Sequence, residues 1–319
     1  MTRWQPTARV AAAHSRASML QRIRCHFDAA GILEVDTPAL SPYAASDTQI
    51  ESFEIPHSQV SQRALYLHTS PEFCMKRLLG AGYPDIFSIC RVFRDGEIGR
   101  RHQPEFTMIE WYRIGFGLRD IIDDTVGVIH AALSKDLLVD EAERIDYRDC
   151  FLQTANVDPL TASVDELAHA AGADGDLRRS VGEHRDDWLD LILAARIAPT
   201  LAKNRLTVLQ HYPASQAALA RLCPDDSLVA DRFEIFFGAI ELANGYVELT
   251  DAAEQSKRIA EDNAERRRRN REIRPHDTTL LAALDSGLPQ CAGVAMGFER
   301  LQMIHANSDD IREVISFSF

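Results

Sequence analysis

The chain has 319 residues, 45% of them hydrophobic and 26% charged, which is the composition of a soluble globular protein with a substantial core. Its formal net charge of −13 argues against a large nucleic-acid footprint, because such binding depends on lysine and arginine side chains that neutralise phosphates. No apolar run reaches the roughly 18 residues of a membrane span, and scattered cysteines without zinc-ligand spacing favour a cytoplasmic protein with reduced thiols.

The N-terminal quarter predicts two helices and short strands. An amphipathic helix is expected over residues 14–30, and Gly31 occupies the usual position just beyond a helix end. Residues 32–35 and 64–68 are expected to be extended. The next helix is expected within 70–80, where a serine–proline pair gives the start and a glycine the end.

Two apolar runs, 86–93 and 106–112, predict a hairpin with an unusually long connection. Hairpin loops usually have about 2–5 residues, and longer ones are often functional. Arginine presents a planar donor fork that matches phosphate oxygens, so the connection is interpreted as an anion grip. Its charged residues are Arg94, Asp95, Glu97, Arg100, Arg101 and His102.

The remaining sequence is helical up to about residue 205 and then alternates strands with helices. A capping box at 163–166 opens one of the helices. The later strands are expected at 206–210, 233–242, 246–249 and 291–296, and a long polar helix over 251–274. Asn244-Gly245 predicts a hairpin turn between the second and third of these strands. This pattern favours an α+β fold on an antiparallel sheet flanked by helices.

The sequence contains neither a GxxxxGK[ST] loop nor a GxGxxG turn after a strand. A nucleotide would therefore be held by arginines from separate elements, with magnesium. Arg300 directly follows the last strand and is one candidate. Glu241 and Glu248 bracket the expected Asn244-Gly245 turn and could reach one site from facing strands, and Glu72 opens a helix nearby.

Five segments together resemble the class II aminoacyl-tRNA synthetases in their lysyl form. FRDGEIGRRHQPEFTMIEWY (93–112) resembles motif 2, and GVAMGFERL (293–301) resembles motif 3. The helix at 14–30 with GILEVDTPAL (31–40) is similar to motif 1. SPEF (70–73) and ELANGYVELTDAAEQ (241–255) also look like lysyl-type segments.

The chain starts at the motif 1 helix, without the N-terminal OB-fold that reads the anticodon. It resembles the family of lysyl-tRNA synthetase paralogues that attach β-lysine to a lysine of elongation factor P. Ala295, where lysyl enzymes have glycine, and residues 211–220 favour this family. The resemblance implies one catalytic domain over 1–319, cytoplasmic and homodimeric through motif 1, with no membrane association and with tRNA an unlikely partner.

The implied activity is that of an ATP-dependent ligase that forms an acyl-adenylate of β-lysine, or lysine, and transfers it to the ε-amino group of the target lysine. Arg94 would hold the α-phosphate, His102 and Arg300 the γ-phosphate, and Phe106 and Arg300 the adenine. Arg94 and Arg300 would be the catalytic residues. The implied ATP site comprises Arg94, Asp95, Gly96, Glu97, His102, Gln103, Phe106, Glu241, Leu242, Gly297 and Arg300.

For the amino acid, the resemblance implies that Glu248 and Tyr112 receive the distal ammonium group and Glu72 the nearer one. Mg²⁺ would be bound by Glu241 and Glu248. Ala295 is expected to disfavour α-lysine by crowding its amine. The implied amino-acid site comprises Ser70, Pro71, Glu72, Tyr112, Asn244, Glu248 and Ala295.

Some features leave alternatives open. Gly96 stands where motif 2 usually has a glutamate facing adenine, so either Glu97 replaces it or backbone groups recognise the base. The arginine-rich segment 266–274 is interpreted as a solvated helix face, with a docking patch as the alternative. A truncated tRNA ligase and an inactive regulatory paralogue are the rival functions.

Overall fold

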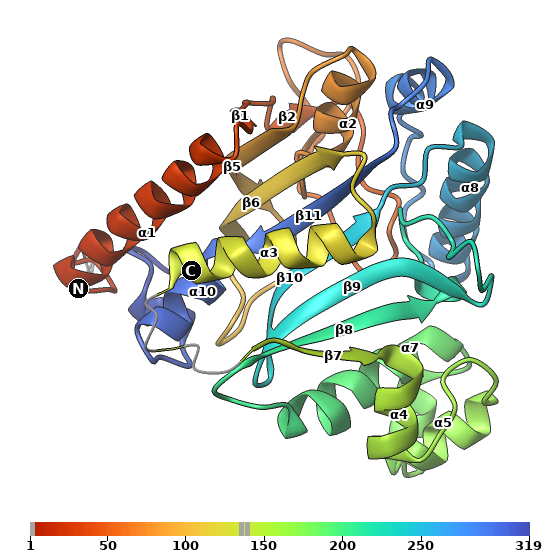
Figure 1. Ribbon diagram of the computed structural model, residues 1–319. Coiled ribbons are helices and arrows are strands. Elements are labelled where there is room, and N and C mark those ends of the chain that lie inside the picture. The colour runs from red at the N-terminus through yellow and green to blue at the C-terminus, as the bar shows by residue number, and fades with distance from the viewer. Residues whose placement is uncertain (1–3, 134–136, 138–140) are drawn as a thin grey trace.

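A large, mostly antiparallel sheet forms the centre of the computed structural model, which describes residues 4–133, 137 and 141–319 (Figure 1). Within these residues the sheet has eight strands in the order β1-β5-β6-β11-β10-β9-β8-β7. Only the outer pairs, β1 with β5 and β7 with β8, are parallel. The α+β class is therefore confirmed. The strands are β1 (Leu33–Glu34), β5 (Ile86–Phe93), β6 (Glu105–Ile114), β7 (Glu143–Asp146), β8 (Leu206–Pro213), β9 (Val229–Phe237), β10 (Ile240–Val247) and β11 (Cys291–Gly297).

A second, small sheet lies beside the first and has the order β2-β4-β3. Its strands are β2 (Leu40–Ser41), β3 (Glu54–Ile55) and β4 (Leu65–Leu67). β4 confirms the strand expected at 64–68. The residues between β2 and β3 cross in front of the large sheet and contribute to the cavity described below.

Helices α1 (Val10–Ala29), α3 (Leu118–Ala132) and α10 (Phe298–His305) cover one face of the large sheet (Figure 1). α1 buries Met19, Ile23 and Phe27, which share one face at a spacing of four residues. The ring of Phe27 stacks on Phe87 of β5 at 4.4 Å between ring centroids. This contact anchors α1 to β5, the first strand of the long hairpin.

A helical insertion between β7 and β8 builds a second core on the opposite face of the sheet, around the buried Trp188 and Phe151. The capping box predicted at 163–166 is present, and Gly172 ends that helix with a left-handed φ of +73°. β7 itself was not predicted. The insertion comprises α4 (Tyr147–Ala155), α5 (Val164–Ala171), α6 (Gly175–Val181) and α7 (Arg185–Ile192), which continues as a π-helical turn over Leu193–Ile197.

The hairpin turn predicted at Asn244-Gly245 is wrong. Both residues lie inside β10, and the chain turns instead between β9 and β10, where Gly238 has a φ of +54°. Gly245 is required by packing: a Cβ atom there would lie 2.5 Å from the ring of Phe233 and 2.9 Å from the carbonyl oxygen of Gly293. The Asn-Gly pair therefore marks close strand packing and no turn.

The solvated-face interpretation of the arginine-rich segment holds for Arg267, Arg268 and Arg271, which are exposed, but is wrong for Arg266 and Arg274, which are buried. α8 spans Ala252–Arg268, and Arg266 on it is fully buried. Its guanidinium group binds both carboxylate oxygens of Glu51, at 2.7 and 2.8 Å, and donates to the carbonyl oxygen of Asp47 at 2.9 Å. Arg274 binds Glu51 as well, at 2.9 Å. These arginines fasten residues 47–51, hereafter the strap, to α8.

The two ends of the described chain lie side by side (Figure 1), since the amide of Thr7 donates to the carbonyl oxygen of Ser316 at 2.7 Å. All six cysteines are free thiols. Among the described residues, no helix combines the length and the apolar character that crossing a membrane requires.

Candidate active site

A cavity of about 1070 Å³ lies on the face of the large sheet that α1 and α3 leave uncovered. The alternation of β6 produces it: Ile109 and Trp111 enter the core, whereas Phe106, Met108, Glu110 and Tyr112 line the cavity. Helix α2 (Glu72–Gly80), the strap and α8 complete the walls. All the expected site residues line this cavity except Asp95 and Gly96.

One end of the cavity is rich in guanidinium groups. Arg94 lies over the ring of Phe106, with its guanidinium carbon 5.1 Å from the ring centroid. Arg300, on the first turn of α10, donates to Nε2 of His102 at 2.8 Å and to the Glu241 carboxylate at 3.1 Å. Burial and the neighbouring Arg300 lower the pKa of His102, so its ring is neutral and can accept this bond. The expected phosphate-binding residues are therefore brought together.

The backbone conformation explains why residue 96 is a glycine and not the glutamate usual in motif 2. The φ of Gly96, +80°, lies in the left-handed region, where a glutamate would be strained. Glu97 lines the cavity, with its carboxylate 3.6 Å from Nη1 of Arg94. Asp95 is exposed, and its amide donates to the carbonyl oxygen of Glu51 at 2.8 Å. Of the two alternatives for the missing glutamate, this geometry favours the one in which Glu97 replaces it.

The opposite end of the cavity is rich in carboxyl groups. Glu110 accepts hydrogen bonds from the hydroxyls of Ser70 and Tyr112, both at 2.7 Å. Burial and the nearby Glu72 raise the pKa of Glu110 to about 8. Ser70 also accepts from the amide of Glu72 at 2.9 Å, but the prediction that it is the N-cap is wrong: α2 runs from Glu72 to Gly80 and its N-cap is Pro71. The sequence analysis missed Glu110, which the alternation between Phe106 and Tyr112 would have indicated.

A fully buried ammonium group joins two of the expected substrate ligands. Nζ of Lys76 lies 2.6 Å from Oε1 of Glu72 and 2.5 Å from Oε2 of Glu248. Burial and Glu72 raise the pKa of Glu248, to about 7, although Lys76 opposes the change. The sequence analysis missed Lys76 too. Its position four residues after Glu72 on a helix was the available signal.

The expectation that Glu241 and Glu248 bind Mg²⁺ stays a prediction, but the two residues do not lie on facing strands. Both residues follow one extended strand, so their Cα atoms are about 20 Å apart. A β-bulge at Leu242 explains why residues seven apart both line the cavity: it shifts the register between Glu241 and Ala243.

Glu234, on β9, is the carboxylate that the sequence analysis missed near Glu241. It pairs with Asn244 in the strand register and lines the same cavity. Burial and Glu241 raise its pKa to about 7, and Arg232 binds it at 2.7 Å. No group of three or more His, Cys, Asp and Glu side chains in the described part of the chain could hold a metal by itself. Mg²⁺ commonly binds one or two carboxylates together with substrate phosphates, and Glu234 with Glu241 fits that pattern.

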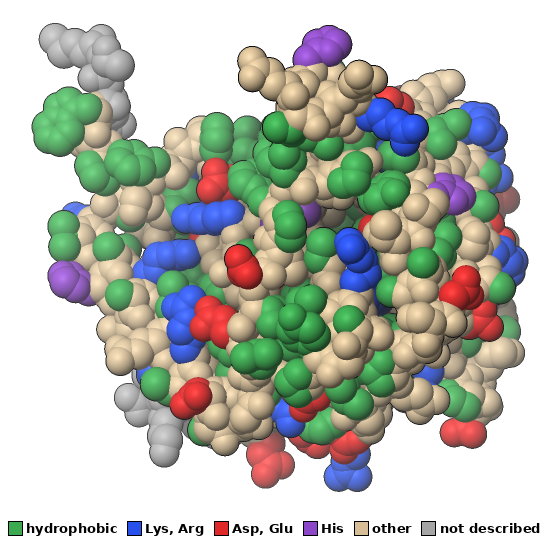
Figure 2. All heavy atoms as spheres, turned by 90° about the horizontal axis from the view of Figure 1, so that it is seen from above, with side chains coloured by type: hydrophobic (Ala, Val, Ile, Leu, Met, Phe, Trp, Pro, Cys, Tyr) green, Lys and Arg blue, Asp and Glu red, His purple; other side chains and the backbone are tan. Residues whose placement is uncertain are grey.

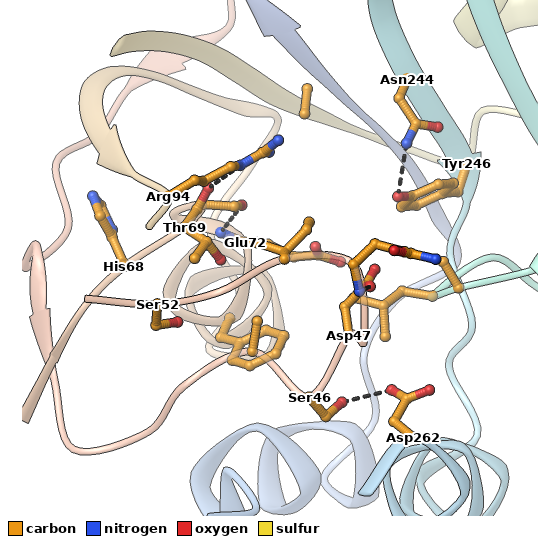
Figure 3. Close-up of a pocket in the computed structure, with 18 of the residues that line it drawn as sticks. Ser46, Asp47, Ser52, His68, Thr69, Glu72, Arg94, Asn244, Tyr246 and Asp262 are labelled. Carbon is orange, nitrogen blue, oxygen red and sulfur yellow. Dashed lines mark hydrogen bonds between the residues drawn. The ribbon is translucent and has the colours of Figure 1, made fainter. Parts of the chain in front are cut away.

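The remaining expected residues line the middle of the cavity. Asn244 donates to the hydroxyl of Tyr246 at 3.2 Å (Figure 3). Ala295 on β11 is paired with Asn244 on one side and with Glu110 on the other. A Cβ atom at Gly293 would lie 2.4 Å from the Tyr112 ring and 2.5 Å from Glu248, so only glycine leaves room for both. Gly297 is the N-cap of α10, and Gln103 is buried.

Figure 3 shows the strap side of the cavity, where Ser46 donates to Asp262 of α8 at 2.7 Å. In the same view Arg94 lies beside Thr69, whose carbonyl oxygen it contacts at 3.5 Å. The strap thus faces the strand residues across the cavity and encloses it from the side of α8.

The family model of tRNA synthetases class II (D, K and N) matches residues 6–319 of this chain. A protein of Pseudoalteromonas translucida named elongation factor P--(R)-beta-lysine ligase is 43% identical over 321 residues, which cover 98% of this chain and 97% of that protein. Proteins with the same name from Avibacterium paragallinarum and Klebsiella pneumoniae are 40% and 41% identical, over 99% of this chain and 97% of each relative.

Proposed function

Because this chain belongs to the class II tRNA synthetases, in the group of the elongation factor P–(R)-β-lysine ligases, we propose that it is an ATP-dependent ligase for elongation factor P. It activates (R)-β-lysine as the acyl-adenylate and transfers the acyl group to the ε-amino group of a lysine on that factor. AMP and pyrophosphate are the other products.

One observation carries the proposal: a single cavity has a cationic end and a carboxyl-rich end. Arg94, Arg300 and His102 lie at the first, and Glu72, Glu110 and Glu248 at the second. A molecule with a triphosphate at one end and two ammonium groups at the other has complementary charges along its whole length. ATP bound next to a diamino acid has this distribution of charge, and so does the aminoacyl-adenylate next to the departing pyrophosphate.

In the first step, a carboxylate oxygen of the amino acid attacks the α-phosphorus of ATP in line with the leaving pyrophosphate. Catalysis of such a step is mostly positioning and charge stabilisation. Arg94 neutralises the α-phosphate, and Arg300 with His102 binds the γ-phosphate. Glu97, 3.6 Å from Arg94, faces the adenine. Phe106 stacks on the base.

In the second step, the unprotonated ε-amine of the target lysine attacks the acyl carbonyl, AMP leaves, and the amine loses a proton to solvent. The product is an amide. This route needs no covalent enzyme intermediate and so no nucleophilic side chain.

Glu241 and Glu234 would hold Mg²⁺ together with phosphate oxygens. When bound, the ion neutralises charge on the phosphates. Arg300 keeps Glu241 in place through two contacts, to its carbonyl oxygen at 2.9 Å and to its carboxylate at 3.1 Å. It also lowers the pKa of Glu241, although burial opposes the change.

The proposed reaction takes place in the cytoplasm, with elongation factor P as partner and a second copy of the chain as the other subunit. The dimer rests on the segment that resembles motif 1, where Leu33 is 46% and Leu40 is 40% exposed. Figure 2 looks onto the side of the molecule where β1 and β2 lie, and apolar side chains lie between charged ones on it. Light scattering at micromolar concentration tests the dimer directly.

The central experiment combines the enzyme, Mg-ATP, elongation factor P and one isomer at a time of β-lysine or α-lysine. Intact-protein mass spectrometry is expected to show one added lysyl residue on the factor, from (R)-β-lysine most efficiently. ATP–pyrophosphate exchange without any gain in mass would overturn the transfer step, and charging of tRNA at a comparable rate would make the chain a tRNA ligase. Absence of exchange with every isomer would identify an inactive paralogue.

A further inference from the structure

Lys76 has no part in the function proposed above, yet it lies among the groups that would bind the amino acid. It is 1% exposed, although lysine is among the residues least often buried. Burial alone would lower its pKa, but Glu248 and Glu72 outweigh burial and raise it, so the side chain is an ammonium ion. A charge in such a place is retained only when it is fully paired.

The two ion pairs of Lys76 use one oxygen of each carboxylate. Nζ lies 2.6 Å from Oε1 of Glu72 and 2.5 Å from Oε2 of Glu248. The second oxygen of Glu248 points toward Gly293 of β11, a residue that lines the cavity. Lys76 therefore fixes the rotation of both carboxylates and leaves the second oxygen of each at the cavity, where the backbone of Gly293 also forms a hydrogen bond with the Glu248 carboxylate.

The charges around this cation come from several elements. Glu72 belongs to α2, Glu248 follows β10, Glu110 and Tyr112 belong to β6, and Cys291 belongs to β11. Burial raises the pKa of Cys291 and of Tyr112, so neither of them carries a charge at neutral pH. Glu110 is largely protonated there as well, with a pKa of about 8.

The sum of these charges matches one class of substrate. Two carboxylates and the Lys76 ammonium would together carry a net charge of −1. A diamino monocarboxylic acid carries two ammonium groups and one carboxylate, a net charge of +1. Without the lysine, the same carboxyl groups would repel one another, and like charges raise the pKa of buried carboxyls.

We propose that Lys76 is a positioning residue for the diamino acid: its two ion pairs hold Glu72 and Glu248 in one orientation, so that each offers one oxygen to one ammonium group of the substrate. This inference rests on the proposed function and adds a residue to it. Lys76 itself touches neither substrate.

Lys76→Met tests the proposal, with Lys203→Met, at an exposed position before β8, as the matched control. ATP–pyrophosphate exchange between pH 6.5 and pH 9 gives KM and kcat for the diamino acid. We expect at least a tenfold higher KM for the diamino acid at pH 7, with kcat and the KM for ATP within twofold of the wild type. Loss of the cation raises the pKa of Glu248. The acid limb of the plot of kcat/KM for the diamino acid against pH therefore moves to higher pH, and binding recovers toward pH 9.

A merely structural lysine would lower the midpoint of thermal unfolding and leave the KM and the acid limb of the folded enzyme unchanged. That result overturns the proposal. Lys76→Arg keeps the charge and is expected to retain the wild-type acid limb even where its KM rises. If Lys76→Met does not fold, Lys76→Gln replaces it, and an acid limb at the wild-type position in that variant counts equally against the proposal.

The wild type separates the two hypotheses. If the wild type catalyses ATP–pyrophosphate exchange and the lysine variants have an unchanged KM for the diamino acid, only the proposed role of Lys76 is refuted. Absence of exchange by the wild type with every diamino acid overturns the proposed function itself.

Discussion

Arg300 donates to Nε2 of His102 at 2.8 Å and so joins the helix after the last strand to the connection of the long hairpin. The bond requires a neutral imidazole, because a protonated ring has no acceptor nitrogen. The lowered pKa of His102 secures this condition at neutral pH. Two segments far apart in the chain thereby form one surface, which in the proposed function binds the phosphates of ATP.

Replacing His102 with alanine is expected to raise the KM for ATP about tenfold, since hydrogen bonds to charged groups contribute about 1.5–3 kcal/mol. The KM for the amino acid is expected to stay unchanged, and ATP–pyrophosphate exchange measures both. In the wild type the bond from Arg300 to His102 is intact at neutral pH and is lost as the pH falls through the lowered pKa of His102. His57→Ala, at an exposed position, is the control; a similar rise in that variant would contradict the assignment.

Glu110→Gln is expected to change how stability depends on pH. Between about pH 4.5 and pH 8 the folded protein holds a proton on Glu110 that the unfolded chain has lost, so the free energy of unfolding falls as the pH rises. Glutamine removes this contribution and keeps an acceptor for Ser70. Each pKa unit corresponds to about 1.4 kcal/mol. We therefore expect the free energy of unfolding of the variant, measured relative to the wild type, to be higher at pH 9 than at pH 6 by on the order of a few kcal/mol. Urea unfolding at both pH values measures it, and parallel curves would refute it.

Arg266→Met is expected to lower the free energy of unfolding by about 1–3 kcal/mol, because it leaves the carbonyl oxygen of Asp47 without its donor and removes one of the arginines that bind Glu51. Arg267→Met on the same helix is the control, since Arg267 is exposed and such substitutions usually change stability by less than about 0.5 kcal/mol. Denaturant midpoints compare the two. Equal midpoints would mean that the strap is held by its other contacts.

Glu234→Gln is expected to raise the Mg²⁺ concentration that gives half-maximal exchange by about tenfold or more, and to leave the KM for the amino acid unchanged. Glu248→Gln is expected to raise the KM for the amino acid and to leave the Mg²⁺ requirement unchanged, because Glu248 lies at the carboxyl-rich end beside Lys76. Titration of Mg²⁺ at saturating ATP separates the two variants. A higher Mg²⁺ requirement in the Glu248 variant would favour the expected metal pair, Glu241 with Glu248.

The elements with strong local signals could be predicted from the sequence. The hairpin strands, the capping box at Ser163 and the helix after β11 are all present. Alternation along β6, once Phe106 and Tyr112 are placed in the cavity, also indicates Glu110. The contact between His102 and Arg300, 198 residues apart, could be expected only through the resemblance.

The sequence-based predictions are wrong where a residue packs against, or binds, a residue that is distant in the sequence. Asn244-Gly245 looked like a turn because the close packing of Phe233 against Gly245 has no local signature. That error placed Glu241 and Glu248 on facing strands and hid Glu234. Arg266 looked solvated because its partner Glu51 lies 215 residues earlier.

The length of β10 also has an evolutionary consequence. Glu241 lies at the start of this strand and Glu248 just beyond its end, so in the proposed function the nucleotide and the amino acid contact different stretches of one β-strand. Substitutions at one end leave the other end in place. A lineage can therefore inherit the chemistry of adenylation intact while it exchanges one amino acid for another, or one acceptor for another.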